Sequence, residues 1–149
     1  MGIGFTFNIG KMGTYVIYGI ILIFVGGMSL FMLKFDLADI TLEIRNNNGI
    51  ETVYVKAADM GYHFKSEDIE SVSMLEKIPK MSKNSGYDGS NFYFGSFSVN
   101  GYDNQCEVYI SLRNPQVILI ETTNKTIIVN HKDTDKTIQM YNLLLDIIE

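Results

Sequence analysis

The stretch Ile40-Thr-Leu-Glu-Ile-Arg45 alternates apolar and polar residues without a break. Because successive side chains of a β-strand point to opposite faces, this pattern predicts a half-buried strand. Asn46-Asn-Asn-Gly49 follows as a strong turn signal, since Asn and Gly tolerate a positive φ. The chain then resumes as a strand from Ile50 to Lys56, so we expect two strands joined by a tight turn.

The same alternation recurs along the chain, and we expect roughly seven or eight short strands in all. The later predicted strands cover residues 62–65, 69–75, 92–99, 105–112, 117–120 and 126–129. The strand from Val117 to Ile120 is apolar on both faces, which predicts that it is covered on both sides. Residues 66–68 are expected to form a single helical turn. Residues 79–91 combine one proline and two glycines with Ser, Asn and Asp, and this composition predicts the longest irregular stretch.

The last segment changes to a helical period. Asp133 is a candidate N-cap, and Asp135 lies in the first turn, where the helix dipole favours a negative charge. The predicted helix of about 15 residues is amphipathic, with a polar stripe on one side. Its apolar side, expected to pack on the strands, consists of Ile138, Tyr141, Leu144, Leu145 and Ile148.

Lys11 and Lys34 enclose 22 consecutive residues without a charge. About 20 helical residues cover the hydrocarbon core of a bilayer, and this segment is apolar on every side. We therefore expect an N-terminal tail over 1–11, a transmembrane helix over 12–34 and a soluble domain over 35–149. A buried core helix and a cleaved signal peptide are the alternatives, although the bulky residues at 31–35 do not resemble a cleavage site.

Composition narrows the location and the class of function. Basic residues near the helix ends number two on the C-terminal side and one on the N-terminal side, which favours a cytoplasmic soluble domain at the cell membrane. The formal net charge of −5 argues against nucleic acid as a partner. A single cysteine excludes an internal disulfide framework.

The sequence offers little material for catalysis. His63 and His131 are isolated and lack metal-ligand spacing, and Cys106 shares the inward face of its strand with Val108 and Ile110, which predicts a buried, inert thiol. Phosphate-binding, dinucleotide-binding and nucleophile-elbow motifs do not occur. We therefore expect no enzyme activity, no cofactor, no metal site and no small-molecule substrate.

Two sets of residues are candidate contact surfaces. Lys77, Lys80 and Lys83 recur every three residues, as expected for a loop that touches lipid phosphates or an acidic partner. The alternative is a solvated loop, because residues 34–149 carry 11 basic and 17 acidic residues, a formal net charge of −6. Phe92 and Phe94 alternate with Tyr93, so one face of their strand exposes aromatic rings unless self-association or a partner at a sheet edge covers it.

Several motifs occur in the order found in one known family. They are Glu67-Asp-Ile-Glu-Ser-Val-Ser-Met-Leu-Glu-Lys-Ile-Pro79, Gly95-Ser-Phe-Ser-Val99, Val108-Tyr-Ile110, Pro115-Gln-Val-Ile-Leu-Ile-Glu-Thr122, Ile128-Val-Asn130 and Thr137-Ile-Gln-Met-Tyr-Asn-Leu-Leu144. Over residues 37–148 the chain resembles the bacterial pleckstrin-homology-like (PH-like) domain. The resemblance implies a bent antiparallel barrel of about seven strands, with the terminal helix closing one open end. It implies no general catalytic activity and no phosphoinositide binding of the eukaryotic kind.

Together these observations predict a membrane-anchored PH-like domain that acts as a protein-interaction or self-assembly module. Its expected partners are the bilayer, through the N-terminal helix, and a second protein or further copies of the same chain. The alternative function is recognition of lipid headgroups or the membrane surface by the basic loop Lys77–Lys83.

Overall fold

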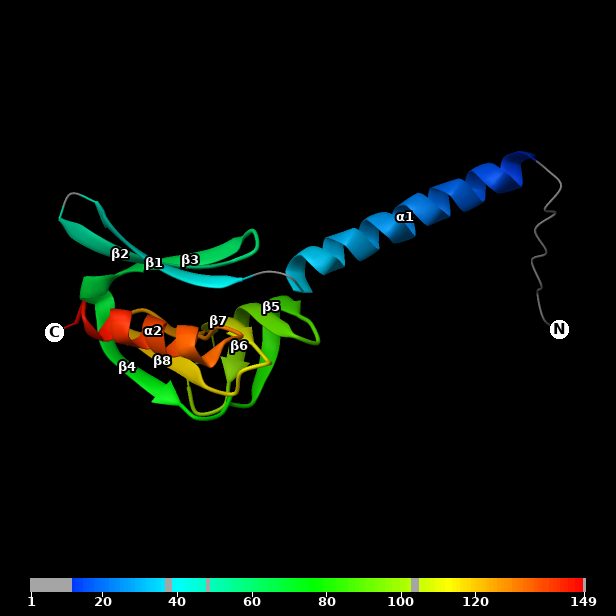
Figure 1. The fold of residues 1–149 in the computed structure, drawn as a ribbon. Coiled ribbons are helices and arrows are strands. Elements are labelled where there is room, and N and C mark those ends of the chain that lie inside the picture. The colour runs from blue at the N-terminus through cyan, green and yellow to red at the C-terminus, as the bar shows by residue number, and fades with distance from the viewer. Residues whose placement is uncertain (1–11, 37–38, 48, 103–104, 149) are drawn as a thin grey trace. The chain divides into compact units, whose positions relative to one another are not determined.

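The computed structural model describes residues 12–36, 39–47, 49–102 and 105–148. The chain divides into two compact units between Phe35 and Asp36. The described part of the first unit belongs to helix α1 (Met12–Asp36), which covers the residues predicted to be helical. The second unit contains the strands and the C-terminal helix (Figure 1).

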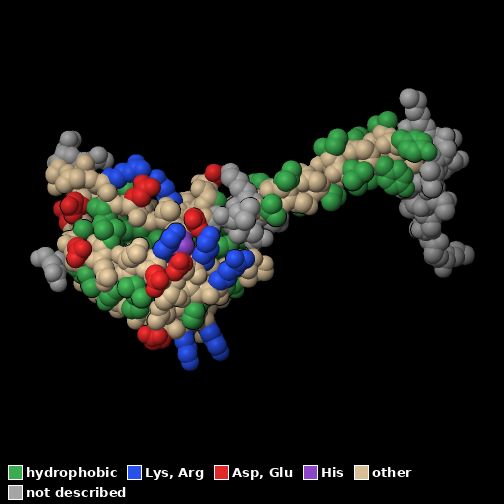
Figure 2. All heavy atoms as spheres, viewed as in Figure 1, with side chains coloured by type: hydrophobic (Ala, Val, Ile, Leu, Met, Phe, Trp, Pro, Cys, Tyr) green, Lys and Arg blue, Asp and Glu red, His purple; other side chains and the backbone are tan. Residues whose placement is uncertain are grey.

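Helix α1 is apolar and open to its surroundings along its length. Gly13–Phe31 is long and apolar enough to cross a membrane. Leu22 and Ile23 leave most of their side-chain surface exposed, and hydrophobic side chains line the helix in Figure 2. The hydroxyl of Ser29 donates to the carbonyl of Val25 at 2.9 Å, so this polar group is satisfied within the helix.

The second unit is mainly β, as predicted. Its strands are β1 (Ile40–Asn47), β2 (Ile50–Ala57), β3 (Met60–Lys65), β4 (Ile69–Leu75), β5 (Met81–Asp88), β6 (Phe92–Val99), β7 (Cys106–Ser111), β8 (Val117–Thr122) and β9 (Thr126–Val129). A 3-10 turn, η1 (Ser66–Asp68), lies between β3 and β4, and helix α2 (Thr134–Leu145) follows β9. The described residues thus contain nine strands where the sequence predicts seven or eight.

The strands form two sheets. One is a three-stranded sheet in the order β1-β2-β3, and the other has the order β4-β8-β9-β7-β6-β5. All pairs are antiparallel except β7 and β9, which run parallel with Val108 opposite Ile128. Strand β9 is inserted between β7 and β8, so the chain that connects those two strands must pass the end of β9. The described strands thus form the mainly antiparallel arrangement that was expected, with this one parallel pair as the exception among them.

The six-stranded sheet bends around its own core. One buried cluster draws its residues from four neighbouring strands, β6 to β9, and includes Phe97, Val108, Leu119 and Ile128. Leu75 of β4 and Met81 of β5 pack against the same cluster from the two opposite edges of the sheet. Only a bent sheet brings both edges to one core. The PH-like class with a C-terminal helix is therefore confirmed, as two bent sheets that do not close into a barrel.

Strand β5 lies where the sequence predicts an irregular loop. Its side chains are mostly exposed and polar because it is an edge strand that pairs only with β6, so it shows no apolar alternation. Gly86 of β5 lies opposite Gly95 of β6, and both have positive φ. A Cβ atom on Gly86 would lie 2.1 Å from the carbonyl oxygen of Phe94, so only glycine permits this approach of the two strands.

Helix α2 packs against β4 and β8. The predicted N-cap is confirmed, because the side chain of Asp133 accepts a hydrogen bond from the backbone N–H of Asp135 at 3.0 Å. The helix has 12 residues rather than about 15, and only Leu144 of its predicted packing side is fully buried. Ile138 and Ile148, predicted to be packed, are exposed.

Candidate functional site

A groove of about 380 Å³ opens between the start of β1 and helix α2. Its lining consists of Asp39, Ile40, Thr41, Leu42, His131, Lys136, Gln139, Met140 and Leu143. The four α2 residues share one face of the helix because they are three, one and three positions apart. The β1 residues are consecutive, so the backbone edge of the strand forms a wall together with its side chains. Ligand pockets commonly have volumes of about 300–1,000 Å³.

The wall formed by β1 is an open strand edge. Strand β1 is outermost in its sheet and pairs with β2 in a register that closes at Asn47 opposite Ile50. In a hairpin with a two-residue turn, the residue pair next to the turn is hydrogen-bonded, and from there hydrogen-bonded pairs alternate with pairs that are not hydrogen-bonded. Ile40, Leu42 and Ile44 belong to pairs of the second kind, so their N–H and C=O groups point away from β2. Within the described residues, no backbone hydrogen bond outside the ladders involves these three residues.

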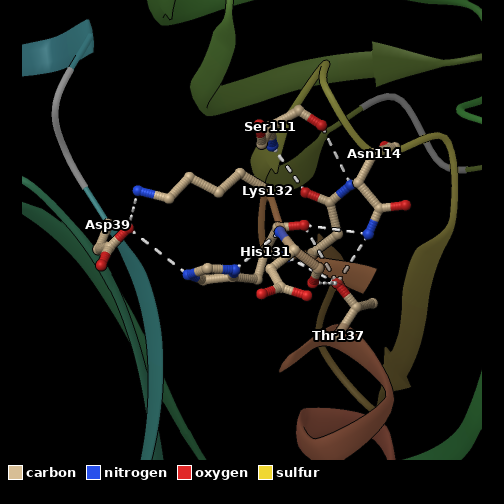
Figure 3. A network of polar contacts seen from close by, with 8 residues as sticks. Asp39, Ser111, Asn114, His131, Lys132 and Thr137 are labelled. Carbon is tan, nitrogen blue, oxygen red and sulfur yellow. Dashed lines mark hydrogen bonds and ion pairs between the residues drawn. The ribbon is translucent and has the colours of Figure 1, made fainter. Parts of the chain in front are cut away.

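The charged end of the groove is built around His131 (Figure 3). Its ring is 3% exposed, and its Nδ1 accepts a hydrogen bond from the backbone N–H of Asp133 at 2.9 Å. A neutral ring bonded in this way holds its proton on Nε2, which faces Oδ1 of Asp39 at 3.5 Å. The ammonium group of Lys132 lies 2.7 Å from the same carboxylate oxygen.

These contacts set the charge of each group. The hydrogen bond from Lys132 lowers the pKa of Asp39 and outweighs the opposing effect of burial, so the carboxylate stays ionised. Burial lowers the pKa of His131, and the nearby Lys136 and Lys132 lower it further, while Asp39 and Asp133 act in the opposite direction. At neutral pH the groove therefore holds a neutral imidazole beside an Asp39–Lys132 ion pair.

A buried polar network holds the first turn of α2 in place. Asn114 donates from Nδ2 to the carbonyl of His131 at 3.0 Å and to the hydroxyl of Thr137 at 2.9 Å. The same hydroxyl oxygen accepts from the backbone N–H of His131 at 3.0 Å. Figure 3 shows Asn114 and Thr137 on one side of His131 and Asp39 on the other. The network thus fixes the position of the helix that forms one wall of the groove.

Asn130, at the end of β9, anchors the crossover between β7 and β8. Its side chain is fully buried, and its Oδ1 accepts from the backbone N–H of Ser111 at 2.6 Å. Its Nδ2 group donates to the carbonyls of Ser111, Asn114 and Gln116 at 3.1, 2.9 and 2.9 Å. One side chain therefore provides hydrogen-bond partners for four backbone groups at the end of β7 and in the connection to β8.

The predicted basic loop is partly neutralised. Lys77 and Lys80 are exposed in the connection between β4 and β5, whereas Lys83 lies on β5. Lys83 forms an ion pair with Asp88 of the same strand. The three lysines therefore do not present three free charges on one loop, and Figure 2 shows acidic and basic side chains mixed over the visible face.

Phe92 and Phe94 are core residues, which corrects the prediction that they form an interface. Their exposed fractions are 1% and 0%, and their rings stack with centroids 5.5 Å apart. Phe94 also stacks on Tyr109 at 6.4 Å. On the opposite face of β6, Tyr93 stacks on Phe97 at 5.4 Å and packs against the buried cluster. Both faces of this strand are thus covered within the domain.

The remaining residues considered for chemistry lie apart from one another. Cys106 is fully buried, as predicted. His63 is exposed on β3 and stacks on Tyr54 at 5.6 Å, far along the chain from the buried His131. Across the described ranges, no three His, Cys, Asp or Glu residues gather where they could hold a metal ion.

Sequence reasoning missed the groove. Its two walls come from residues 39–42 and 136–143, and no local pattern indicates that these segments lie together. One signal was available on α2, where Met140 and Leu143 stand outside the predicted apolar side and give the helix a second, partly apolar face. An apolar face beyond the packing side is a general sign of a binding surface.

Comparison with known proteins assigns the family. No curated protein and no solved structure matches the chain. The bacterial PH domain family matches residues 34–144, a range that includes all nine strands and α2 as far as Leu144. PH domains are in general binding modules for proteins or lipids and are not catalysts. The chain therefore belongs to the bacterial PH domain family.

Proposed function

We propose that this protein is a single-pass membrane protein whose PH-like domain, residues 35–149, binds a separate protein or further copies of the same chain and performs no catalysis. Residues 12–34 serve as the membrane anchor after a short tail over 1–11, and the domain lies in the cytoplasm. The support for the anchor is the apolar surface of α1, in which the hydroxyl of Ser29 is satisfied by a hydrogen bond within the helix.

The observation that carries the protein-binding function is the groove between β1 and α2. It combines exposed apolar side chains, such as Leu143 with 41% exposure, with an open strand edge that needs hydrogen-bond partners. Protein interfaces use this combination of apolar contact and backbone hydrogen bonds.

Lipid recognition by the basic loop is the second candidate function. Lys77 and Lys80 support it, because both are exposed and neither forms an ion pair with a described residue. The pairing of Lys83 with Asp88 and the acidic charge of the domain oppose it. Titration of the full chain in neutral detergent with dihexanoyl phosphatidylserine tests this function. Thermal stabilisation that disappears when Lys77, Lys80 and Lys83 are changed to Glu would establish it.

Photo-crosslinking in membranes tests the protein-binding function. A photoreactive amino acid replaces Gln139 at the groove, and a matched control places it at Asn124, which is exposed in the turn between β8 and β9. We expect a polypeptide adduct from position 139 and none from position 124. An adduct of twice the 16.9 kDa chain mass indicates self-assembly, and any other mass indicates a separate partner. Equal labelling from both positions, or none, contradicts the function.

A further inference from the structure

We propose that the groove binds an extended segment of a partner polypeptide, which adds to β1 as a further strand and places an acidic side chain beside Lys136. This inference rests on the protein-binding function proposed above and specifies the chemistry of its partner.

The open edge of β1 favours an extended polypeptide as the ligand. The peptide groups of Ile40, Leu42 and Ile44 recur every two residues, about 6.6 Å apart, and all point away from β2. A strand laid alongside offers N–H and C=O groups at the same interval, whereas a helix keeps its own within its ladder and a lipid chain has none. The unpaired edge therefore selects a strand-forming segment.

The size of the groove sets the length of that segment. Asp39 and the first three residues of β1 line it, a span of about 13 Å for extended chain, and the α2 wall from Lys136 to Leu143 spans about 10 Å. About four residues of an added strand fit between these walls. Alternate side chains of the segment would lie against Leu42, Met140 and Leu143, so apolar β-branched residues suit these positions.

The charge at the end of the groove specifies the acidic residue. Lys132 is paired with Asp39, whereas Lys136 makes no ion pair with any described residue. His131 adds no charge while it is neutral. Asp39 repels an incoming carboxylate, but its own charge is compensated by Lys132. Lys136 is therefore the cation left to hold an acidic side chain.

The direction of the segment follows from the same geometry. Antiparallel pairing is slightly more stable per residue than parallel pairing. A strand antiparallel to β1 has its carboxyl side next to Asp39, where β1 begins, and this is the end of the groove that holds His131 and Lys136. The acidic residue thus follows the apolar residues in the partner sequence. The described strands of a folded second copy all lie within its own two sheets, so none of them is a free extended segment of the kind that fits this role.

A defined peptide provides the test. The probe is a fluorescein-labelled nine-residue peptide that alternates threonine and valine, with one glutamate near its carboxyl end and blocked termini. Binding to the full chain in neutral detergent is measured by fluorescence anisotropy. We expect binding that a proline at the central valine abolishes, because proline cannot donate to the ladder. Lys136→Glu is expected to weaken binding about tenfold and to favour a peptide with lysine in place of glutamate.

Lys80→Glu is the matched control, since it makes the same change of charge on an exposed lysine outside the groove, and it is expected to bind like the wild type. Bound peptide should also slow amide hydrogen exchange at Ile40, Leu42 and Ile44. The inference is overturned by absence of binding at about 1 mM peptide, by equal affinity of Lys136→Glu, or by unchanged exchange at these amides. Equal binding of a peptide with a free C-terminus and no glutamate also overturns it. Crosslinking from position 139 with failure of these peptide tests would retain the protein-binding function and reject only this inference.

Discussion

Replacement of Asn130 tests whether hydrogen bonding of one side chain holds the β7–β8 crossover and, through it, α2. Asn130→Ala removes all four contacts to Ser111, Asn114 and Gln116 and leaves a small cavity. Asn130→Asp keeps the shape of the side chain and the acceptor for the N–H of Ser111. However, it replaces the donor group, which faces three carbonyls, with a second acceptor.

The expected magnitude follows from the number of bonds. A typical hydrogen bond contributes about 0.5–1.5 kcal/mol to stability, and a buried group left without a partner costs about 1–3 kcal/mol. Four bonds to a fully buried side chain give a loss near 3 kcal/mol for Asn130→Ala, if water reaches part of the cavity. Asn130→Asp should cost at least as much, because its buried carboxyl group faces carbonyl oxygens or must be protonated.

Urea unfolding of the full chain in detergent measures these losses. The chain has no tryptophan, so near-UV circular dichroism of its nine tyrosines reports the transition. Asn124→Ala, at an exposed turn, is the matched control and should change the free energy of unfolding by less than about 0.5 kcal/mol. If Asn130→Asp is much milder than Asn130→Ala, then cavity formation and not hydrogen bonding explains the role of Asn130, and the reasoning is refuted.

Three further predictions use other features of the domain. Ala58, in the β2–β3 turn, has a φ of +52°, so Ala58→Gly should raise the free energy of unfolding by about 0.5–1 kcal/mol in urea titrations, and an unchanged midpoint would contradict this. The lowered pKa of His131 means that the unfolded chain takes up a proton more readily than the folded chain, so the free energy of unfolding should fall as the pH decreases through about 6.5. Unfolding curves at pH 7 and 5.5 measure this loss, which should be smaller in His131→Gln. Buried Cys106 should resist a membrane-impermeant maleimide until the protein is denatured. Ser90→Cys, at an exposed position, should react in the native protein once the membrane is opened. Reaction of this variant in sealed cells would indicate the opposite orientation.

The polar network and the β1–β2 ladder hold the two walls of the groove that we propose as the binding surface. Thr137 and Asn114 hold the first turn of α2, and β2 holds β1 along its full length. Both walls are therefore positioned before a partner arrives. Preorganised walls reduce the entropy lost on binding, which favours recognition of short segments that bury little area.

Local features of the sequence were sufficient to predict the elements. The long run of uncharged, mostly apolar residues predicts α1, the alternation of apolar and polar residues predicts most of the strands, and Asp133 marks the start of α2. The burial of Cys106 follows from the same alternation. Each of these properties depends on residues within a few positions of one another, because the backbone repeat alone decides which side chains share a face.

Strand order, by contrast, was decided only in the tertiary structure. The insertion of β9 between β7 and β8 depends on which strand edges remain unpaired once the other strands are in place. Residues 81–88 form strand β5 because their backbone pairs with β6. Phe92 and Phe94 are covered by neighbours from other elements, and the groove joins segments about 95 residues apart. The alternation of apolar and polar residues shows which side chains share a face of a strand, but it does not show what packs against that face. Strand pairing and burial depend on contacts between residues far apart in the sequence, which a short stretch of sequence does not contain.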